Sequence, residues 1–517
     1  MEDGLIVAID CGTQSARALL FDDTGCLLAK EKVEFTPYFS DAPGWAEQDP
    51  EVYYNSICQA CQRMAESVPQ LWKRVNGVVL TTQRDTCVVI DDQRKVLRPA
   101  IVWLDQRMAS NPPPFPAHLK AGFAAVGMLP TATLTQKKCK GQWIRENQPD
   151  IWAKVDKFLL LSGWLNMRLT GRIADSIANQ IGHIPFNYKR KSWPTSRFDY
   201  RWYMTGMNPR LLPELVEPAD LIGNVTAEAS CDTGIPEGTP VYAGGSDKGC
   251  ETLGTGCMEP SCACISLGTT ATLQITTDRY VEPIKFMPPY PAVIPGHYNP
   301  EVEIFRGYWM ISWFKQEFGM REMVLARERG VSPESLLNEL LDETPPGSMG
   351  LLLQPYWGPG LKMPEARGAI IGFGDFHTRA HVYRAIIEGI AYALLDSAQR
   401  VERTSRVAID RIMLSGGGSQ ADSICQITAD IFNRTVLRGE TNEGSGLGAA
   451  IVGFVGSGRY RSFDEAISSM VRYEATFEPN PSHAATYREL YTRVYKKMYS
   501  RLKPLYSQMR EITGYPE

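Results

Sequence analysis

Two segments of the chain share one pattern of apolar and polar residues: an apolar strand, a turn with a Gly-Thr pair, and a second strand. The first runs over residues 6–23 and the second over residues 263–278. Glycine at such a turn lets a ligand approach the backbone closely, and the free N–H groups there form a concave site for anions. One hairpin of this kind is usually an ordinary β-turn. Two of them, about 250 residues apart, predict a duplicated nucleotide-binding fold with a cleft between the halves.

Alternating strand and helix patterns fill the first half of the chain. The predicted strands lie at 5–10, 16–21, 26–34, 76–82, 86–91 and 240–244. The predicted helices lie near 50–67, 136–147, 149–154 and 159–169. Residues 185–240 are rich in Pro, Trp and polar residues, which predicts long loops and short helices there.

The second half begins again with strands, over residues 262–275. The predicted helices that follow lie near 307–318, 333–342, 378–403, 419–432, 445–457 and 482–509, with strands at 409–414 and 434–438. A Pro- and Gly-rich segment, 355–364, predicts a loop beside the cleft. This order predicts an α/β fold whose sheets are covered by helices.

Composition narrows the class of protein. A chain of 517 residues is longer than a single hydrophobic core usually supports, and we expect two domains, 1–253 and 254–517. The net charge of −4 gives no basic footprint for nucleic acid. No apolar run reaches the roughly 18 residues of a membrane span, and we find no secretory leader pattern. The twelve cysteines are scattered, which is typical of reduced thiols, and we expect a cytoplasmic protein.

Asp10 ends the first predicted strand, directly before the first Gly-Thr turn. A carboxylate in that position repels phosphate unless a divalent cation lies between them, and Mg²⁺ favours one or two carboxylates with waters and phosphate oxygens. The alternative is an Asp that accepts turn amides. The second hairpin favours the metal.

Asp247 follows the apolar strand at 240–244, at the strand end where open α/β sheets bind ligands. An Asp there can take a proton from a hydroxyl that attacks a phosphoryl group. The alternative is an N-cap that starts the next helix.

Polar residues interrupt the strands at 78–90 as Thr81-Thr82-Gln83-Arg84-Asp85-Thr86. Arg and Asp side chains together can bind neighbouring hydroxyls of a small polyhydroxy ligand; the alternative is a hairpin tip with an internal ion pair. Trp103 can pack on the carbon face of such a ligand or belong to the core. Gly417 and Gly418 follow another strand and suit a flat ring or a phosphate on bare backbone.

Taken together, these motifs resemble the FGGY family of carbohydrate kinases, in the family's order, from Ile6 to about Gly458. The most similar segments are IDCGTQSARALLFD, GWAEQDP, TTQRDT, PAIVWLDQR, LSGWLNMRLTG and KGQWIREN. The resemblance implies two ribonuclease-H-like domains of the actin and hexokinase type, with ATP and a sugar between them. It also implies Mg²⁺ as a cofactor.

Carried over position by position, the resemblance implies Asp247 as catalytic base and Asp10 as the carboxylate associated with Mg²⁺. The residues that it places around ATP are Thr13, Gln14, Ser15, Arg17, Gly268, Thr269, Gly417 and Gly418. Those that it places around the sugar or polyol are Arg84, Asp85, Trp103 and Asp247.

Three departures argue against a plain glycerol kinase. Asp85 stands where that enzyme has Glu, and Thr135 stands where it has a Tyr that contacts glycerol. Lys248 follows the predicted base, where many relatives carry Asn, Gln or Ala. We expect Lys248 to reach into the sugar pocket, to pair with Asp85, or to point into solvent.

We therefore expect an ATP-dependent kinase of a small sugar or polyol, such as a ketopentose (xylulose or ribulose) or a C3–C5 polyol. A homodimer is left open. The alternative is an actin- or heat-shock-like ATPase without a sugar acceptor, which shares the hairpins but gives no reason for the polar segment at 81–86. A catalytically silent relative is disfavoured because Asp10 and Asp247 are both present.

Overall fold

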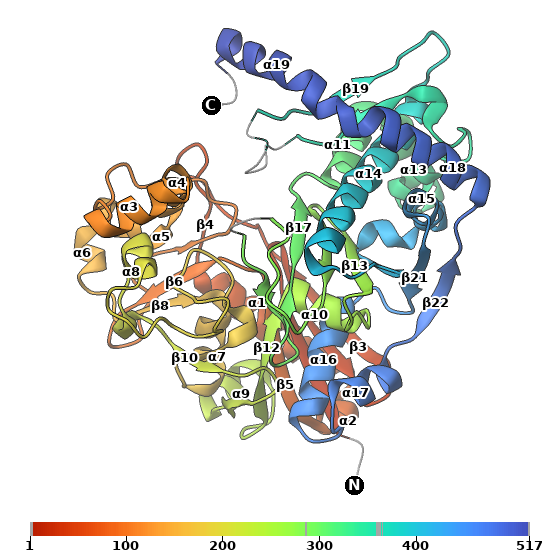
Figure 1. The fold of residues 1–517 in the computed structure, drawn as a ribbon. Helices are drawn as coiled ribbons and strands as arrows, with labels where there is room; N and C mark the ends of the chain where they lie inside the picture. Colours follow the sequence, from red (N-terminus) through yellow and green to blue (C-terminus); the bar gives the residue numbers. More distant parts are fainter. Residues whose placement is uncertain (1–3, 285–286, 358–362, 364, 515–517) are drawn as a thin grey trace.

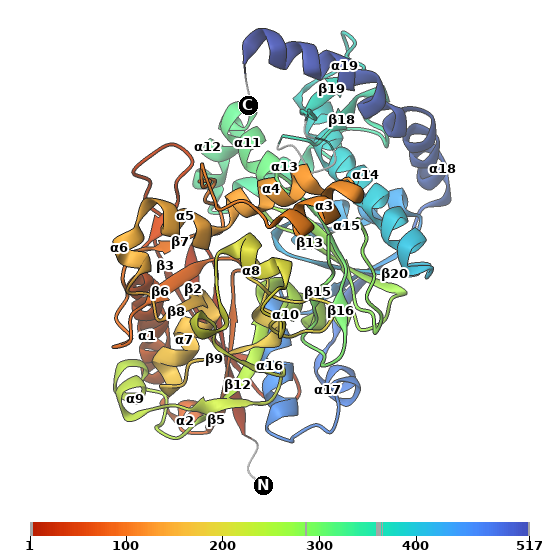
Figure 2. The same cartoon turned by 60° about the vertical axis from the view of Figure 1, so that its left-hand side comes forward.

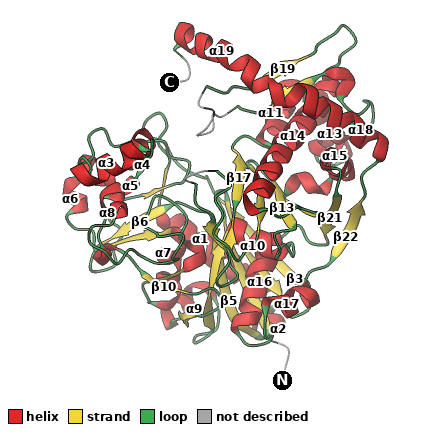
Figure 3. Cartoon of the chain, in the orientation of Figure 1, coloured by secondary structure: helices red, strands yellow, loops and turns green. Residues whose placement is uncertain are grey.

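The computed structural model describes residues 4–284, 287–357, 363 and 365–514. Most of the segment 355–364, which the sequence predicts to be a loop, lies outside these residues. Figures 1 and 2 place the two ends of the chain at opposite ends of the molecule. The strands of the two halves adjoin at the centre, with helices around them (Figure 3).

Two six-stranded sheets form the framework. In spatial order the first consists of β11 (Leu221–Asn224), β12 (Pro240–Ser246), β5 (Val75–Thr82), β1 (Leu5–Cys11), β2 (Ser15–Phe21) and β3 (Leu27–Glu34). The second consists of β17 (Glu301–Ile304), β14 (Ala271–Ile275), β13 (Cys262–Leu267), β20 (Arg411–Ser415), β21 (Thr435–Gly439) and β22 (Tyr473–Phe477).

The two sheets have the same spatial pattern of parallel and antiparallel neighbours, although the outermost strand precedes its neighbour along the chain in the first sheet (β11, β12) and follows it in the second (β21, β22). In each, the first three strands along the chain pair antiparallel as two hairpins: β1, β2 and β3 in one, β13, β14 and β17 in the other. Two further strands then add in parallel beside the first, and the outermost is antiparallel. This repetition confirms the duplicated α/β fold predicted from the two Gly-Thr hairpins, although the 253/254 boundary stays a prediction.

Shorter strands form separate small sheets beside the framework. They are β4 (Glu47–Gln48), β6 (Cys87–Ile90), β7 (Ala100–Ile101), β8 (Lys157–Leu160), β9 (Ala174–Ser176), β10 (Glu214–Val216), β15 (Tyr290–Pro291), β16 (Tyr298–Asn299), β18 (Leu352–Gln354) and β19 (Ala369–Ile371).

Helices in the N-terminal half are α1 (Pro50–Ser67), α2 (Pro69–Trp72), α3 (Ala117–Ala125), α4 (Leu129–Lys138), α5 (Lys140–Asn147), α6 (Pro149–Trp152), α7 (Leu161–Thr170), α8 (Tyr200–Thr205), α9 (Ala227–Thr233) and α10 (Asp247–Gly254). Those that follow are α11 (Trp309–Phe318), α12 (Met320–Arg329), α13 (Pro333–Glu339), α14 (Arg379–Ser405), α15 (Asp422–Phe432), α16 (Gly444–Gly456), α17 (Phe463–Met470), α18 (Pro481–Leu490) and α19 (Lys496–Thr513). A short 3₁₀ helix, η4 (Gly417–Gln420), precedes α15.

Several predicted elements need correction. The helix predicted at 136–147 is broken at Cys139, whose extended backbone separates α4 from α5. The predicted helix at 159–169 begins with strand β8, which pairs with β6. The single helix predicted at 482–509 is α18 and α19 joined by a π-helical turn at Tyr491–Tyr495.

Helix α16 belongs to the C-terminal half of the chain but packs on the N-terminal sheet. Its apolar residues, such as Leu447 and Ile451, share one buried cluster with Ile6, Leu19 and Val79 of the first sheet. Figure 1 shows α16 in blue beside the red N-terminal strands. The two halves therefore share a hydrophobic core and are not merely tethered.

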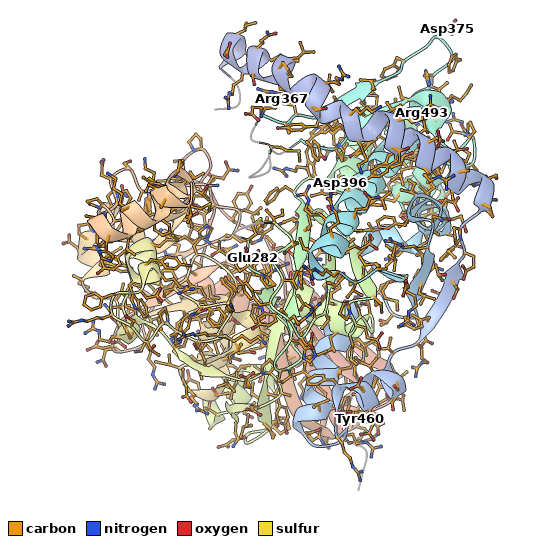
Figure 4. All side chains as sticks on the ribbon, viewed as in Figure 1. Glu282, Arg367, Asp375, Asp396, Tyr460 and Arg493 are labelled. Carbon is orange, nitrogen blue, oxygen red and sulfur yellow. The ribbon has the colours of Figure 1, made fainter. Side chains whose placement is uncertain are left out.

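The loop after α16 adds a second tie between the halves. The hydroxyl of Tyr460, labelled in Figure 4, donates to the backbone carbonyl of Asp23 in the β2–β3 turn. The Asp23 carboxylate also accepts from Arg459 Nε at 2.7 Å. The base of the molecule is thus held together by polar contacts as well as apolar ones.

Helices α10 and α16 cross at glycines with almost no space between their backbones. A Cβ at Gly448 would lie 1.9 Å from the Cys250 carbonyl oxygen, and one at Gly254 would lie 2.0 Å from the Gly444 carbonyl oxygen. Only glycine permits this approach. The contact sets the distance between the sheet that precedes α10 and the sheet that precedes α16.

We predict that Gly448→Ala forces α10 and α16 apart. Overpacking of a tight contact costs about 1–3 kcal/mol or more in the free energy of unfolding. Denaturant unfolding measures it, with Gly122→Ala in α3 as the control, because nothing lies within 4 Å of a Cβ there and alanine favours a helix by up to about 1 kcal/mol. Equal effects of the two substitutions would contradict this account of the contact.

Candidate active site

The carboxyl ends of the parallel strands bring the predicted site residues together. Asp10 of β1 lies opposite Thr81 of β5, and Thr81 lies opposite Gly245 of β12. The segments that follow these strands, including Arg84 and Asp247, therefore leave the sheet along one edge. This is the edge at which open α/β sheets bind ligands.

The first Gly-Thr hairpin joins β1 to β2. Its turn is closed by the Gly12 N–H, which donates to the Ser15 carbonyl at 3.0 Å. Gln14 at the tip is exposed, whereas Ser15 is buried at the start of β2. Arg17 lies across from Asp10 in the register, and its Nη1 is 3.1 Å from Asp10 Oδ2.

Glu443 brings a second carboxylate to this hairpin from the other half of the chain. It is the residue before α16, and its Oε2 lies 3.3 Å from Arg17 Nη1. Lys30 also pairs with Glu443. Arg17 therefore bridges Asp10 and Glu443, which come from opposite halves.

Asp10 is buried and lies among other acids. Burial raises the pKa of Asp10 to about 7; Arg17 lowers it, whereas Asp247, Glu443 and Glu251 raise it further. Its hydrogen-bond donor is Arg17, so the sequence alternative of a carboxylate that accepts turn amides is wrong.

The second Gly-Thr hairpin joins β13 to β14, and its turn is braced by α11. The Tyr308 N–H donates to the Gly268 carbonyl at 3.0 Å, and the Trp309 N–H donates to the Thr269 carbonyl at 3.2 Å. With those carbonyls occupied, the turn keeps its shape. The Thr269 side chain at its tip is exposed.

The two glycines that begin η4 after β20, Gly417 and Gly418, have different surroundings. A Cβ on Gly417 would meet nothing within 4 Å, so its backbone is open to a ligand. A Cβ on Gly418 would lie 2.4 Å from the Tyr308 ring. Gly418 is thus explained by close packing against Tyr308, whether or not a ligand also lies nearby.

Asp247 is the first residue of α10, and the preceding residue, Ser246, is the N-cap of this helix. The Ser246 hydroxyl accepts the Gly249 N–H at 3.2 Å, as an N-cap does. The sequence alternative that Asp247 is the cap is therefore wrong. The Asp247 side chain is 31% exposed, which leaves its carboxylate accessible to a ligand.

Lys248 is held by partners that the sequence did not predict, and its place in the sugar pocket stays a prediction. Its Nζ is 2.7 Å from Glu251 Oε2 and 2.6 Å from the Ser266 hydroxyl at the end of β13. Burial lowers the pKa of Lys248, but Glu251 and Asp247 raise it by more, so the group stays charged. The predicted pairing with Asp85 and the predicted solvent position are both wrong, because the ammonium group pairs with buried Glu251 and donates to the buried Ser266 hydroxyl.

Arg84 and Asp85 find separate partners, so the alternative of an internal ion pair at this turn is wrong. Arg84 Nη1 and Nη2 donate to the two carboxylate oxygens of Glu301, at 3.1 and 2.9 Å. Arg84 Nε lies 3.9 Å from Asp247 Oδ1. Glu301 comes from β17, in the other half of the chain.

Asp85 adopts a left-handed backbone, with φ of 53°, and its carboxylate is well occupied. It accepts the His183 N–H at 2.9 Å, lies 2.8 Å from His183 Nδ1, and is 3.2 Å from Lys140 Nζ. Burial raises the pKa of Asp85, but Lys140 and His183 outweigh it and hold that pKa well below its usual range. Asp85 thus fixes the His183 ring, which is 33% exposed.

Trp103 links the sugar-side segment to the first hairpin. Its Nε1–H donates to Thr13 Oγ1 at 2.9 Å, and the Thr13 hydroxyl donates to Gln83 Oε1 at 3.2 Å. The ring is half-buried, so it is not an ordinary core residue. The two predicted ligand regions are therefore joined by one hydrogen-bonded chain.

Sequence models of the FGGY family of carbohydrate kinases match nearly the whole chain. The model of the N-terminal domain matches residues 5–254, and the model of the C-terminal domain matches residues 263–457. The chain belongs to the FGGY family of carbohydrate kinases. It is therefore a phosphotransferase that acts on a carbohydrate, and the resemblance stated from the motifs is confirmed.

Curated relatives within the FGGY family align over the full length. Xylulose kinase of Lactococcus lactis subsp. lactis (strain IL1403) is 29% identical, over 98% of this chain and 99% of the relative. Gluconokinase of Bacillus subtilis (strain 168) is 26% identical, over 94% of each chain.

Solved structures agree in fold. Gluconate kinase from Lactobacillus acidophilus has a TM-score of 0.83 at 20% identity, covering 98% of this chain and 100% of that one. Xylulose kinase from Rhodospirillum rubrum has a TM-score of 0.82 at 25% identity, covering 97% and 100%. The two-domain actin and hexokinase-type fold expected of an FGGY kinase is thereby confirmed.

An open pocket of about 570 Å³ lies beside the glycine cluster of this FGGY chain. It is bordered by α13, by the end of η4 and by the start of α15, and its lining includes Asn338, Gln420 and Ala421. Gln420 is the last residue of η4, the 3₁₀ helix that begins at Gly417. The motif carry-over expects adenine beside Gly417 and Gly418, which precede Gln420 in η4.

Sequence reasoning missed four side chains that hold the predicted site residues of this FGGY chain. They are Lys140, His183, Glu251 and Glu301. The alternation Glu301-Val302-Glu303-Ile304 carries a strand signal that could have revealed β17. Glu251 stands three residues after Lys248, a helical spacing that could have suggested the pair. Nothing local in the sequence marks Lys140 or His183 as partners, because both are set by tertiary contacts.

Within the described residues, none of the helices combines the length and the apolar character needed to cross a bilayer.

The raised pKa of Asp10 predicts that the stability of the fold depends on pH. Between about pH 4 and pH 7 the folded chain retains a proton on Asp10 that the unfolded chain has released, so this residue's contribution to stability falls as the pH rises through that window. Without Mg²⁺ or nucleotide, Asp10→Asn should therefore melt at a higher temperature than the wild type at pH 8, with little difference near pH 4.

Calorimetric Tm values across this range make the comparison, with exposed Asp41→Asn as the control. A difference between Asp10→Asn and the wild type that is independent of pH would contradict the assignment.

Proposed function

We propose that this FGGY kinase transfers the γ-phosphoryl group of ATP to a hydroxyl of a small neutral sugar or polyol, such as a ketopentose (xylulose or ribulose) or a C3–C5 polyol. The observation that carries the proposal is the position of Asp247. Its accessible carboxylate stands at the sheet edge, with Asp10 of the first hairpin among its electrostatic neighbours. Arg84 lies on one side of it.

The proposed reaction needs one proton acceptor. Asp247 takes the proton of the acceptor hydroxyl, the hydroxyl oxygen forms a bond to the γ-phosphorus, and the bond to the β–γ bridging oxygen breaks to release ADP. In the proposed complex, backbone N–H groups in the turns after Gly12 and Gly268 would bind the developing phosphate charge. Lys248 sits one residue from the base and one hydrogen bond from Ser266 of the second hairpin.

The site fits a divalent cation held largely by its substrates. Among the described residues, no cluster of three or more His, Cys, Asp or Glu side chains is arranged to hold a metal. Mg²⁺ commonly takes one or two carboxylates and completes its shell with waters and phosphate oxygens. Asp10 is the proposed protein ligand, because its pKa is raised by burial and by neighbouring acids that a cation would offset. When bound, Mg²⁺ would neutralise phosphate charge.

Charge at the acceptor side favours a neutral substrate. Arg84, Lys140 and Lys248 each pair with a carboxylate already. Burial and neighbouring Glu301 raise the pKa of Glu303 to about 7, and Asp247 adds to the shift. A sugar acid would have to displace one of these pairs, whereas a neutral polyol needs only hydrogen bonds.

The actin-like ATPase alternative gains no support. It would not require Arg84 and Asp247 to lie 3.9 Å apart, nor a partly exposed His183 ring held by Asp85. Full-length similarity to xylulose kinases and gluconokinases also favours a sugar acceptor.

An ADP-release assay over neutral ketoses, C3–C5 polyols and sugar acids tests this proposal. We expect ADP release to require a neutral ketose or polyol and Mg²⁺, with a matching phosphate ester detected by mass spectrometry. Turnover with sugar acids alone would refute the neutral acceptor class. ADP release that no sugar stimulates would refute the kinase proposal in favour of an ATPase.

Asp247→Asn is expected to lower kcat by about 10²–10⁴-fold, the usual cost of losing a general base. Binding of ATP and of the sugar, followed by calorimetry, should change little, because the amide keeps the shape of the side chain. Near-normal kcat in a folded variant would remove Asp247 from the role of base.

A further inference from the structure

Arg84 is held across the two halves of the chain by a bidentate ion pair. Both guanidinium Nη atoms donate to Glu301, at 3.1 and 2.9 Å. The Arg84 and Glu301 side chains are 16% and 4% exposed. Arg84 follows β5 of the first sheet and Glu301 begins β17 of the second, so 217 residues separate them. Planar pairing of this kind fixes orientation as well as charge.

The pair leaves one edge of the guanidinium directed at the catalytic region. With both Nη atoms engaged by Glu301, Nε is the group that lies 3.9 Å from Asp247 Oδ1. Tyr290 packs beneath, with its ring centroid 5.1 Å from Arg84 Cζ. The guanidinium is thus fixed by Glu301 at one edge and Tyr290 at one face.

We infer that Glu301 is a positioning residue for acceptor recognition: the C-terminal half orients Arg84, and Arg84 then binds the acceptor beside Asp247. The inference rests on the proposed function, which places the acceptor at Arg84. Glu301 itself reaches the acceptor only through Arg84. Recognition of the sugar therefore depends on a contact between the two halves, although Arg84 belongs to the N-terminal half.

A purely structural role for the pair makes a different prediction. A buried carboxylate that only ties the halves together would lower stability and active fraction when removed. It would change kcat and both KM values without regard to substrate. A positioning role acts through Arg84 and appears mainly in the KM for the acceptor.

The test is a double-mutant cycle of Glu301→Gln, Arg84→Gln and the double variant, with KM for acceptor and for ATP, kcat, and Tm measured for each. We expect Glu301→Gln to raise the acceptor KM by about tenfold or more, as loss of a charge-assisted contact does, with a much smaller change in the ATP KM. On the Arg84→Gln background it should add little, because its effect passes through Arg84.

The matched control is Glu322→Gln. Glu322 forms the same kind of bidentate pair, with Arg379 at 2.7 and 2.6 Å, between α12 and α14. The Glu322→Gln substitution should lower Tm without a selective rise in the acceptor KM. If Glu301→Gln does not fold, Glu301→Asp takes its place in the cycle, since it keeps the charge but is too short to hold both Nη atoms.

Effects of Glu301 and Arg84 that multiply independently would overturn the inference, as would a change in Glu301→Gln that merely follows Tm as in Glu322→Gln. Either result, obtained with a wild type that phosphorylates a sugar, leaves the proposed function intact. A wild type without sugar-dependent turnover overturns the proposed function, and this inference with it.

Discussion

The glycine contact between α10 and α16 is the constraint on which the site depends. Each helix follows the last parallel strand of its own sheet, and each begins with an acid at the sheet edge or directly before it, Asp247 for α10 and Glu443 for α16. Because the backbones meet at Gly254 and Gly448, the N-terminal ends of the two helices are held close to both Gly-Thr hairpins. A larger residue at the crossing would separate the acids from the phosphate turns.

The two helices contact the opposite halves by different chemistry. Helix α16 buries apolar residues against β1, β2 and β5, which provides non-directional stabilisation. Helix α10 uses polar contacts with the second sheet: Lys248 and Glu251 both bond to Ser266. Hydrogen-bonded charges require correct geometry, so this side of the interface aligns the base with the second hairpin.

The Gly-Thr hairpins, the parallel strands beside them and α1 could be predicted from sequence because their signals are local, whereas the outer strands β11, β17 and β22 were not predicted. Helix α1 spans Pro50–Ser67 as predicted, since Asp49 caps it and Pro50 suits its first turn. The ends of predicted strands mark Asp10 and Asp247, and the polar segment between two strands marks Arg84 and Asp85.

The partners of the site residues could not be predicted in full from local sequence patterns. Lys248 illustrates this, because its ammonium is fixed by Glu251 three residues on and by Ser266 in another sheet. A helical i,i+3 pair could be suspected from sequence, but the burial that makes it decisive comes from packing of the two halves. The Arg84–Glu301 pair depends wholly on that packing.

The central claim is that an acceptor hydroxyl and the γ-phosphate meet at Asp247, between the two halves. A crystal structure with a non-hydrolysable ATP analogue, Mg²⁺ and the acceptor that supports turnover tests it most directly. The account predicts an acceptor hydroxyl about 2.6–3.2 Å from an Asp247 carboxylate oxygen, with the γ-phosphate against the Gly268–Thr269 turn. An acceptor bound away from Asp247, with another group next to its reacting hydroxyl, would contradict it.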